Sequence, residues 1–192
     1  MKKWMLVGLI VLAPYYASAA ESANAGLAER AQQSRIEVKA FMGELKHALK
    51  SALKSGGPIA GVEVCSKVAP AIAAAQSRKT GWRIGRTSLR PRNPDNAPDA
   101  WEKRVLKKFE ARKAAGEDPK KMEFYEVTKL KGKPVFRYMK AIPTAPKPCL
   151  ACHGKNIKPD VIKKLDRYYP DDRARGYQAG DIRGAFSIIQ PL

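Results

Sequence analysis

The first half of the chain has apolar residues at helical spacing. Between residues 27 and 54 the apolar positions recur mostly every three or four residues, with lysine and glutamate between them. They are Leu27, Ala31, Val38, Phe41, Leu45, Leu49 and Leu53. This pattern predicts a long amphipathic helix that ends at Ser-Gly-Gly-Pro, residues 55–58, because these residues break helices. A second, alanine-rich helix is predicted over residues 59–77, with a bend at Pro70 because proline has no backbone N–H.

The second half favours strands. Residues 82–89 are rich in β-forming side chains and lead into a proline-rich loop, residues 90–98. Residues 123–130 and 134–142 flank Lys-Gly-Lys, which predicts a β-hairpin, and residues 184–189 predict a last strand.

Two further helices are predicted between and after these strands. Asp99 and Glu102 have capping-box spacing at the start of a helix that ends near Gly116, and residues 159–168 form a short helix. This order fits the α+β class, with an antiparallel sheet and long N-terminal helices packed on it, better than alternating βαβ units.

The N-terminus resembles an export signal. Lys2 and Lys3 precede an apolar run over residues 4–13, and the small residues Ala-Ser-Ala-Ala follow at 17–20. The run is about half the ~20 residues of a spanning helix, so we expect a signal peptide over residues 1–20, cleaved near Ala19, rather than an anchor. Residues 21–192 are expected to form one periplasmic domain without a transmembrane segment.

The chain is strongly basic. Its 192 residues include 37 Lys or Arg and 18 Asp or Glu, a formal charge of +19, and 44% of them are hydrophobic. This apolar content is enough for a core, so the class of disordered proteins is excluded. Export argues against nucleic acid as a partner, and the charge instead suggests acidic proteins, an anionic membrane surface or an anionic cofactor.

One motif carries chemistry. Cys149, Cys152 and His153 form C-x-x-C-H, the attachment motif of c-type haem. On one helical turn the two thiols face one porphyrin edge, while the histidine points at the iron. A thioredoxin-like redox pair would need a βαβ setting, and a zinc site would need a second ligand pair; the sequence shows neither.

The second axial ligand has several candidates. His47 is predicted to face water, and Met42 and Met122 resemble gap-fillers near the core. Met139 is predicted to point to the opposite face of its strand from Tyr138. Cys65 is the one cysteine left once the two motif thiols bind the haem. It is either a small buried core residue or a thiolate ligand of the iron.

Five ordered blocks of the chain resemble a family of domains of unknown function that bind c-type haem on a PAS-like fold. Its members are small exported monohaem proteins and sensory parts of signalling proteins. The blocks are Val64-Cys65 with Ala69-Pro70, Arg86-Thr87-Ser88-Leu89-Arg90 with Arg92-Asn93-Pro94, Asn96-Ala97-Pro98-Asp99 with Trp101-Glu102, Cys149 to His153, and Gly176-Tyr177 with Gly180-Asp181-Ile182-Arg183-Gly184-Ala185.

The resemblance implies one haem c with His153 and Cys65 as axial ligands. Thiolate donation then favours ferric iron and a low reduction potential. Arg86, Arg90 and Arg183 stand in the matching blocks, where guanidinium groups would pair with the haem propionates. Tyr177 and Trp101 are candidates for lining the pocket or for packing in the core.

Three functions follow from this assignment. The first is a redox or ligand sensor, in which a change at the iron releases Cys65 and a separate acidic partner receives the signal. The alternative is a small electron-transfer cytochrome that docks acidic redox partners. An enzyme is least favoured, because His47 is the only other histidine available for acid-base chemistry.

Overall fold

The computed structural model describes residues 15–192, with side chains from residue 24 onward. The predicted signal peptide, residues 1–20, falls largely outside the described residues, so its cleavage stays a prediction.

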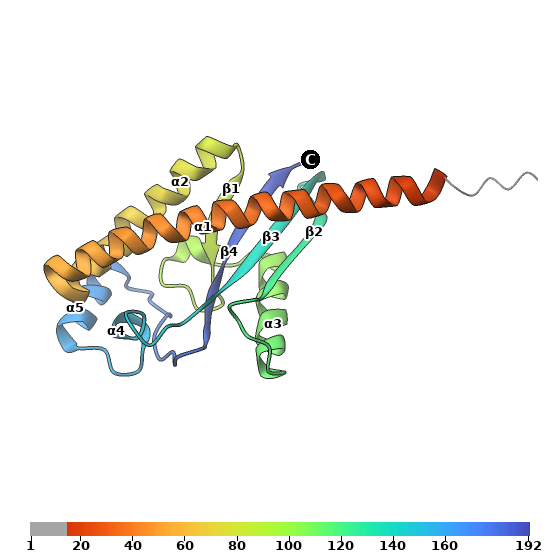
Figure 1. Cartoon of the computed structure of the whole chain (residues 1–192). Helices are drawn as coiled ribbons and strands as arrows, with labels where there is room; N and C mark the ends of the chain where they lie inside the picture. Colours follow the sequence, from red (N-terminus) through yellow and green to blue (C-terminus); the bar gives the residue numbers. More distant parts are fainter. Residues whose placement is uncertain (1–14) are drawn as a thin grey trace, which may run out of the picture.

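A helical hairpin forms the N-terminal layer (Figure 1). Helix α1 (Tyr15–Glu63) continues through a π-helical turn (Val64–Val68) into α2 (Ala69–Thr80). The predicted break is confirmed, because Gly56 and Gly57 have non-helical backbone angles and Gly57 has a φ of 62°. The chain reverses there, and α2 lies beside the part of α1 that precedes the break.

This helical segment bears on the predicted absence of a membrane span. Within the described residues, Asn24–Thr80 is long and apolar enough by composition to cross a membrane, with a mean hydropathy of 1.3 in its window. Core helices of soluble proteins and signal sequences meet the same criterion. The break at Gly57 also divides the segment into two runs. The absence of a span in the mature chain stays a prediction.

Four antiparallel strands form one sheet in the order β1-β4-β3-β2. The strands are β1 (Arg83–Thr87), β2 (Glu123–Leu130), β3 (Lys133–Pro143) and β4 (Ile182–Pro191). The predicted hairpin is confirmed: Lys131 and Gly132 both have positive φ, 51° and 80°, as a tight hairpin turn requires. The α+β class with an antiparallel sheet is therefore confirmed.

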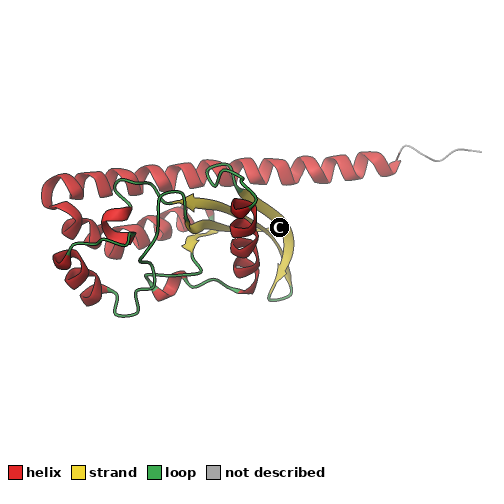
Figure 2. Ribbon diagram, turned by 90° about the horizontal axis from the view of Figure 1, so that it is seen from below, coloured by secondary structure: helices red, strands yellow, loops and turns green. Residues whose placement is uncertain are grey.

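Helices cover both faces of the sheet, as Figure 2 shows from below. Alternate strand residues point to opposite faces, so Phe136 and Tyr138 pack beneath α1 and α2, while Met139 packs beneath α3 (Ala100–Ala114). The capping box predicted at the start of α3 is present, since Asp99 and Glu102 cap each other's backbone N–H.

The remaining short elements gather at one end of the sheet. They are a 3-10 turn (Pro94–Asn96), α4 (Leu150–His153) and α5 (Pro159–Tyr168). A small apolar cluster of Val62, Val161, Leu165 and Tyr169 joins α5 to the far end of α1, and Cys152 packs against it. The cysteine motif is thereby held beside the helix that leads to Cys65.

Candidate functional site

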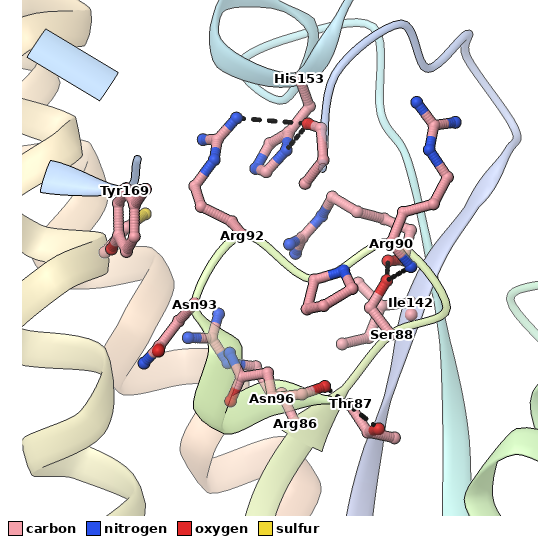
Figure 3. A pocket seen from close by; sticks show the side chains of 15 residues that line it. Arg86, Thr87, Ser88, Arg90, Arg92, Asn93, Asn96, Ile142, His153 and Tyr169 are labelled. Carbon is pink, nitrogen blue, oxygen red and sulfur yellow. Dashed lines mark hydrogen bonds between the residues drawn. The ribbon is translucent and has the colours of Figure 1, made fainter. Parts of the chain in front are cut away.

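Four of the predicted site residues meet in one cavity. Cys65, Arg86, His153 and Arg183 come from the π-helical turn, β1, α4 and β4, and all four line a cavity of about 550 Å³ that includes its open mouth. Figure 3 shows the loop after β1 crossing this cavity below His153. The fold therefore assembles these residues from four separate parts of the sequence.

The two remaining predicted residues, Cys149 and Cys152, lie on the turn that presents His153. The His153 N–H donates to the Cys149 carbonyl at 2.9 Å, which closes one helical turn and places positions 149, 152 and 153 on one side. Both thiols are free and half-buried. Burial raises the pKa of Cys152, so this thiol is neutral at physiological pH.

His153 is buried and its tautomer is fixed by its neighbour. The ring Nδ1 lies 2.8 Å from the Ala174 carbonyl oxygen, and because that oxygen only accepts, Nδ1 carries the proton. Burial, together with the charge of Arg183, holds the pKa of His153 well below its usual range. The imidazole is therefore neutral, with the Nε2 lone pair free to bind a metal. Tyr177 stacks edge-on against the ring at 6.3 Å.

Arg86 and Arg183 bring positive charge that no carboxylate compensates. Within residues 24–192 neither guanidinium forms an ion pair, and the buried Arg183 Nε has no hydrogen-bond partner. Burial and repulsion from Arg183 lower the pKa of Arg86 to about 10. Two adjacent cations without a counter-charge make this wall of the cavity suited to an anionic group.

Arg90 is less free than the other two arginines. Its guanidinium donates to the carbonyl oxygens of Arg173 and Arg175 and lies 4.4 Å over the Tyr177 ring. Arg90 lines the cavity, but its donors hold the loop of residues 173–175 in place.

Cys65 sits in the π-helical turn, half-buried and lining the cavity. Pro70 has no N–H to donate to the carbonyl four residues earlier, and the Ala69 N–H reaches back to Val64, five residues away. The bend predicted at Pro70 is thus taken up by a widened turn just before it, at Cys65. Single π turns inside α-helices occur frequently at functional sites.

The other ligand candidates lie elsewhere. His47 is exposed, as predicted, and Met122 and Met139 are fully buried in the cluster beneath α3. Met42 packs against the core beneath α1. Trp101 belongs to the α3 cluster, where its Nε1 donates to Glu126 at 2.5 Å, so the core interpretation holds for this residue.

The sequence did not reveal three residues of the site. Arg92 and Asp172 form a buried ion pair at 3.1 Å that ties the loop after β1 to the segment after α5, and Tyr169 closes the cavity beside the π-helical turn. Arg92 and Tyr169 line the cavity. No periodicity signals a pairing between residues 80 positions apart, although Arg92 stands in one of the blocks that resemble the haem-binding family.

The fold and the site together define a class: an α+β domain whose sheet end holds a Cys-x-x-Cys-His turn facing a thiol and two arginines that have no ion-pair partner within residues 24–192. A family model described as Tll0287-like matches residues 16–191, so the chain belongs to the Tll0287-like family. Among solved structures, the chain is similar to the crystal structure of the cyanobacterial heme-protein Tll0287, with a TM-score of 0.64 and 22% sequence identity. The match covers 85% of this chain and 96% of that one, and at this identity it shows the fold alone. None of the curated proteins matches the chain.

Proposed function

We propose that the chain carries one covalently attached haem c and works in the periplasm as a redox or ligand sensor. Cys149 and Cys152 are the attachment thiols, His153 and Cys65 are the axial ligands, and Arg86 and Arg183 hold the propionates. The fold is interpreted as PAS-like. Membership in a family that includes a cyanobacterial heme-protein supports the cofactor class.

The observation that carries the proposal is the meeting of Cys65 and His153 at one cavity. A neutral imidazole with a free Nε2 and a thiol on a separate element form a pair of donors for one iron, and iron binding would deprotonate the thiol. The unpaired guanidinium groups of Arg86 and Arg183 match the two carboxylates of a haem.

Each side chain has a distinct task in this scheme. The two motif thiols hold the cofactor covalently, His153 keeps its orientation through the Ala174 carbonyl, and Cys65 supplies a ligand that can leave. When bound, haem supplies an iron that changes oxidation state and takes small axial ligands. The described residues therefore include a candidate for each task that a haem c requires: two attachment thiols and two iron ligands.

The sensing role rests on where Cys65 is placed. His153 lies on α4, which comes after β3, whereas Cys65 belongs to the helical hairpin. Release of Cys65 would therefore free the π-helical turn to move relative to the sheet. The strongly basic surface suits an acidic protein that receives the signal.

Electron transfer is the second candidate, favoured by a formal charge of +17 on residues 21–192, which is the +19 of the full chain less Lys2 and Lys3. A carrier would exchange electrons with an acidic partner at rates that fall steeply with salt. A sensor instead requires a change of structure when the iron is reduced and binds a ligand.

Attachment is tested by producing the full chain in a bacterium that matures c-type cytochromes. We expect haem to remain on the denatured chain, in the periplasmic fraction, and to be lost in the Cys149→Ser/Cys152→Ser variant. Cys65→Ser is the matched control and keeps covalent haem. Haem that remains covalently bound to the Cys149→Ser/Cys152→Ser variant after denaturation contradicts the proposal.

Sensing is tested by hydrogen exchange of the ferric protein and of the reduced protein with carbon monoxide. We expect faster exchange confined to the π-helical turn and the helix before it, with the sheet unchanged. Identical exchange in both states contradicts the sensor and leaves the electron carrier.

A further inference from the structure

Two donors share one carbonyl behind His153. The Ala174 oxygen accepts from His153 Nδ1 at 2.8 Å and from Arg92 Nη2 at 3.2 Å, as the dashed lines in Figure 3 show. All three residues are buried, with Arg92 only 9% exposed. Water therefore screens this contact poorly.

We propose that Arg92 sets how strongly His153 donates electrons to a bound metal, acting through the carbonyl that the two residues share. The proposal rests on the proposed function, because it concerns His153 as an axial ligand. Arg92 is a positioning residue here and does not touch the cofactor's iron.

The direction of the effect follows from electrostatics. A guanidinium on the Ala174 oxygen draws electron density from it and weakens the hydrogen bond that this oxygen accepts from His153 Nδ1. A weaker bond leaves the imidazole less anionic and a poorer donor to ferric iron. The positive charge itself also disfavours ferric iron, so Arg92 raises the reduction potential in both ways.

Asp172 opposes Arg92 from the other side. Its Oδ1 accepts from Arg92 Nε at 3.1 Å and from the Ala174 N–H at 2.9 Å, and its side chain is 1% exposed. Its Oδ2 accepts from Arg175 Nε at 2.8 Å. Asp172 therefore reduces the positive field that Arg92 places on the Ala174 carbonyl. The two side chains act in opposite directions on the hydrogen bond between this carbonyl and His153 Nδ1.

Arg92 also has a structural task, because its Nη2 donates to the Cys152 carbonyl at 2.5 Å and so ties the attachment turn to the loop. A purely structural role predicts that breaking the ion pair from either end has the same effect. The tuning role predicts opposite effects, because one substitution removes a positive charge and the other a negative charge.

The test compares Arg92→Gln with Asp172→Asn in the haem-loaded full chain. At the wild-type midpoint potential we expect the ferric-to-ferrous ratio to rise at least tenfold in the first variant and to fall at least tenfold in the second, or about 59 mV each for one electron. Arg92→Lys keeps the charge and is expected to stay near wild type. Should Arg92→Gln fail to fold, the shift of Asp172→Asn decides the sign.

A second readout separates the effect of Arg92 through the Ala174 carbonyl from the direct effect of its charge on the iron. In a Cys65→Ala background, the iron–histidine stretch of the ferrous protein is expected to rise with Arg92→Gln and fall with Asp172→Asn, because His153 becomes the stronger or weaker donor. Arg173→Gln is the matched control: it removes an exposed positive charge next to Ala174 in the chain, and its guanidinium does not donate to the Ala174 carbonyl, so the stretch is expected to stay unchanged.

The outcomes separate the two claims. A haem-loaded chain in which both variants shift the potential in the same direction, or in which neither moves the stretch, overturns the role of Arg92 alone. A chain that takes up no covalent haem overturns the proposed function and this inference with it.

Discussion

Arg86→Gln should stabilise the haem-free protein. Arg86 is half-buried, has no carboxylate partner within residues 24–192, and faces the charge of Arg183. Removing a buried charge usually costs stability because a partner is left alone, but here no partner exists. The structure therefore predicts a gain where an arginine deletion would ordinarily give a loss.

The size of the gain follows from the pKa of Arg86. Burial and Arg183 lower this pKa to about 10, so the folded state disfavours the charged guanidinium by about 3 kcal/mol at neutral pH, an upper limit because solvent reaches part of the side chain. The substitution also loses the contact of the guanidinium over the Phe41 ring at 5.7 Å, worth about 1 kcal/mol. Because the first figure is an upper limit, we expect a net stabilisation of at most about 2 kcal/mol.

Urea unfolding of the haem-free chain measures this difference, and about 2 kcal/mol raises the midpoint by roughly 1 M. Arg83→Gln is the matched control on the same strand; its side chain is 64% exposed, so its free energy of unfolding changes by about 0.5 kcal/mol or less. The haem-loaded protein should show the reverse sign for Arg86→Gln, because the propionate loses its partner. Destabilisation of the haem-free protein would refute the argument that this charge is uncompensated.

Three further outcomes are expected. Gly184→Ala places a Cβ 2.3 Å from the Thr87 carbonyl oxygen on the paired strand, and should lower the free energy of unfolding by about 2 kcal/mol or more in urea. Burial raises the pKa of Asp172, but Arg92 and the hydrogen bonds outweigh it and lower the pKa overall; the stability this carboxylate provides is present at neutral pH and is lost as the pH falls below about 4, measured as melting temperature against pH. Asp99→Ala removes the cap of α3 and should cost about 1–2 kcal/mol in urea.

Each of these predictions has a control. Gly43→Ala lies in a helix with open space around it and should stabilise by up to about 1 kcal/mol, so equal losses at both glycines would contradict the steric argument. Asp172→Asn should remove part of the acid dependence; an unchanged pH profile would show that this carboxylate is not responsible. Asp99→Asn keeps a capping side chain and should lose less than Asp99→Ala.

Much of the fold could be predicted because its causes are local. The apolar spacing before residue 54, the Gly-Gly-Pro break, the capping box at Asp99 and the Lys-Gly turn each act within a few residues, and the structure contains all of them. The π-helical turn at Cys65 could not be predicted in the same way. Pro70 indicates a missing donor, but whether the helix kinks, ends or widens depends on what packs around it.

The candidate site was predictable only in part, for the same reason. The spacing of Cys149, Cys152 and His153 predicts a shared task, whereas the meeting of Cys65 with His153 at one cavity depends on tertiary structure. The buried pair of Arg92 and Asp172 has no sequence signature, since charged residues in loops are usually solvated.

Axial ligation by Cys65 is the central claim about this protein. The decisive measurement is the absorption and EPR spectrum of the purified haem-loaded protein, ferric and then reduced with carbon monoxide, compared with Cys65→Ala. We predict a low-spin, thiolate-ligated ferric signal that is absent in the variant, and displacement of the thiolate by carbon monoxide on reduction. The same ferric spectrum in both proteins would contradict the account and make Cys65 a packing residue at the wall of the cavity.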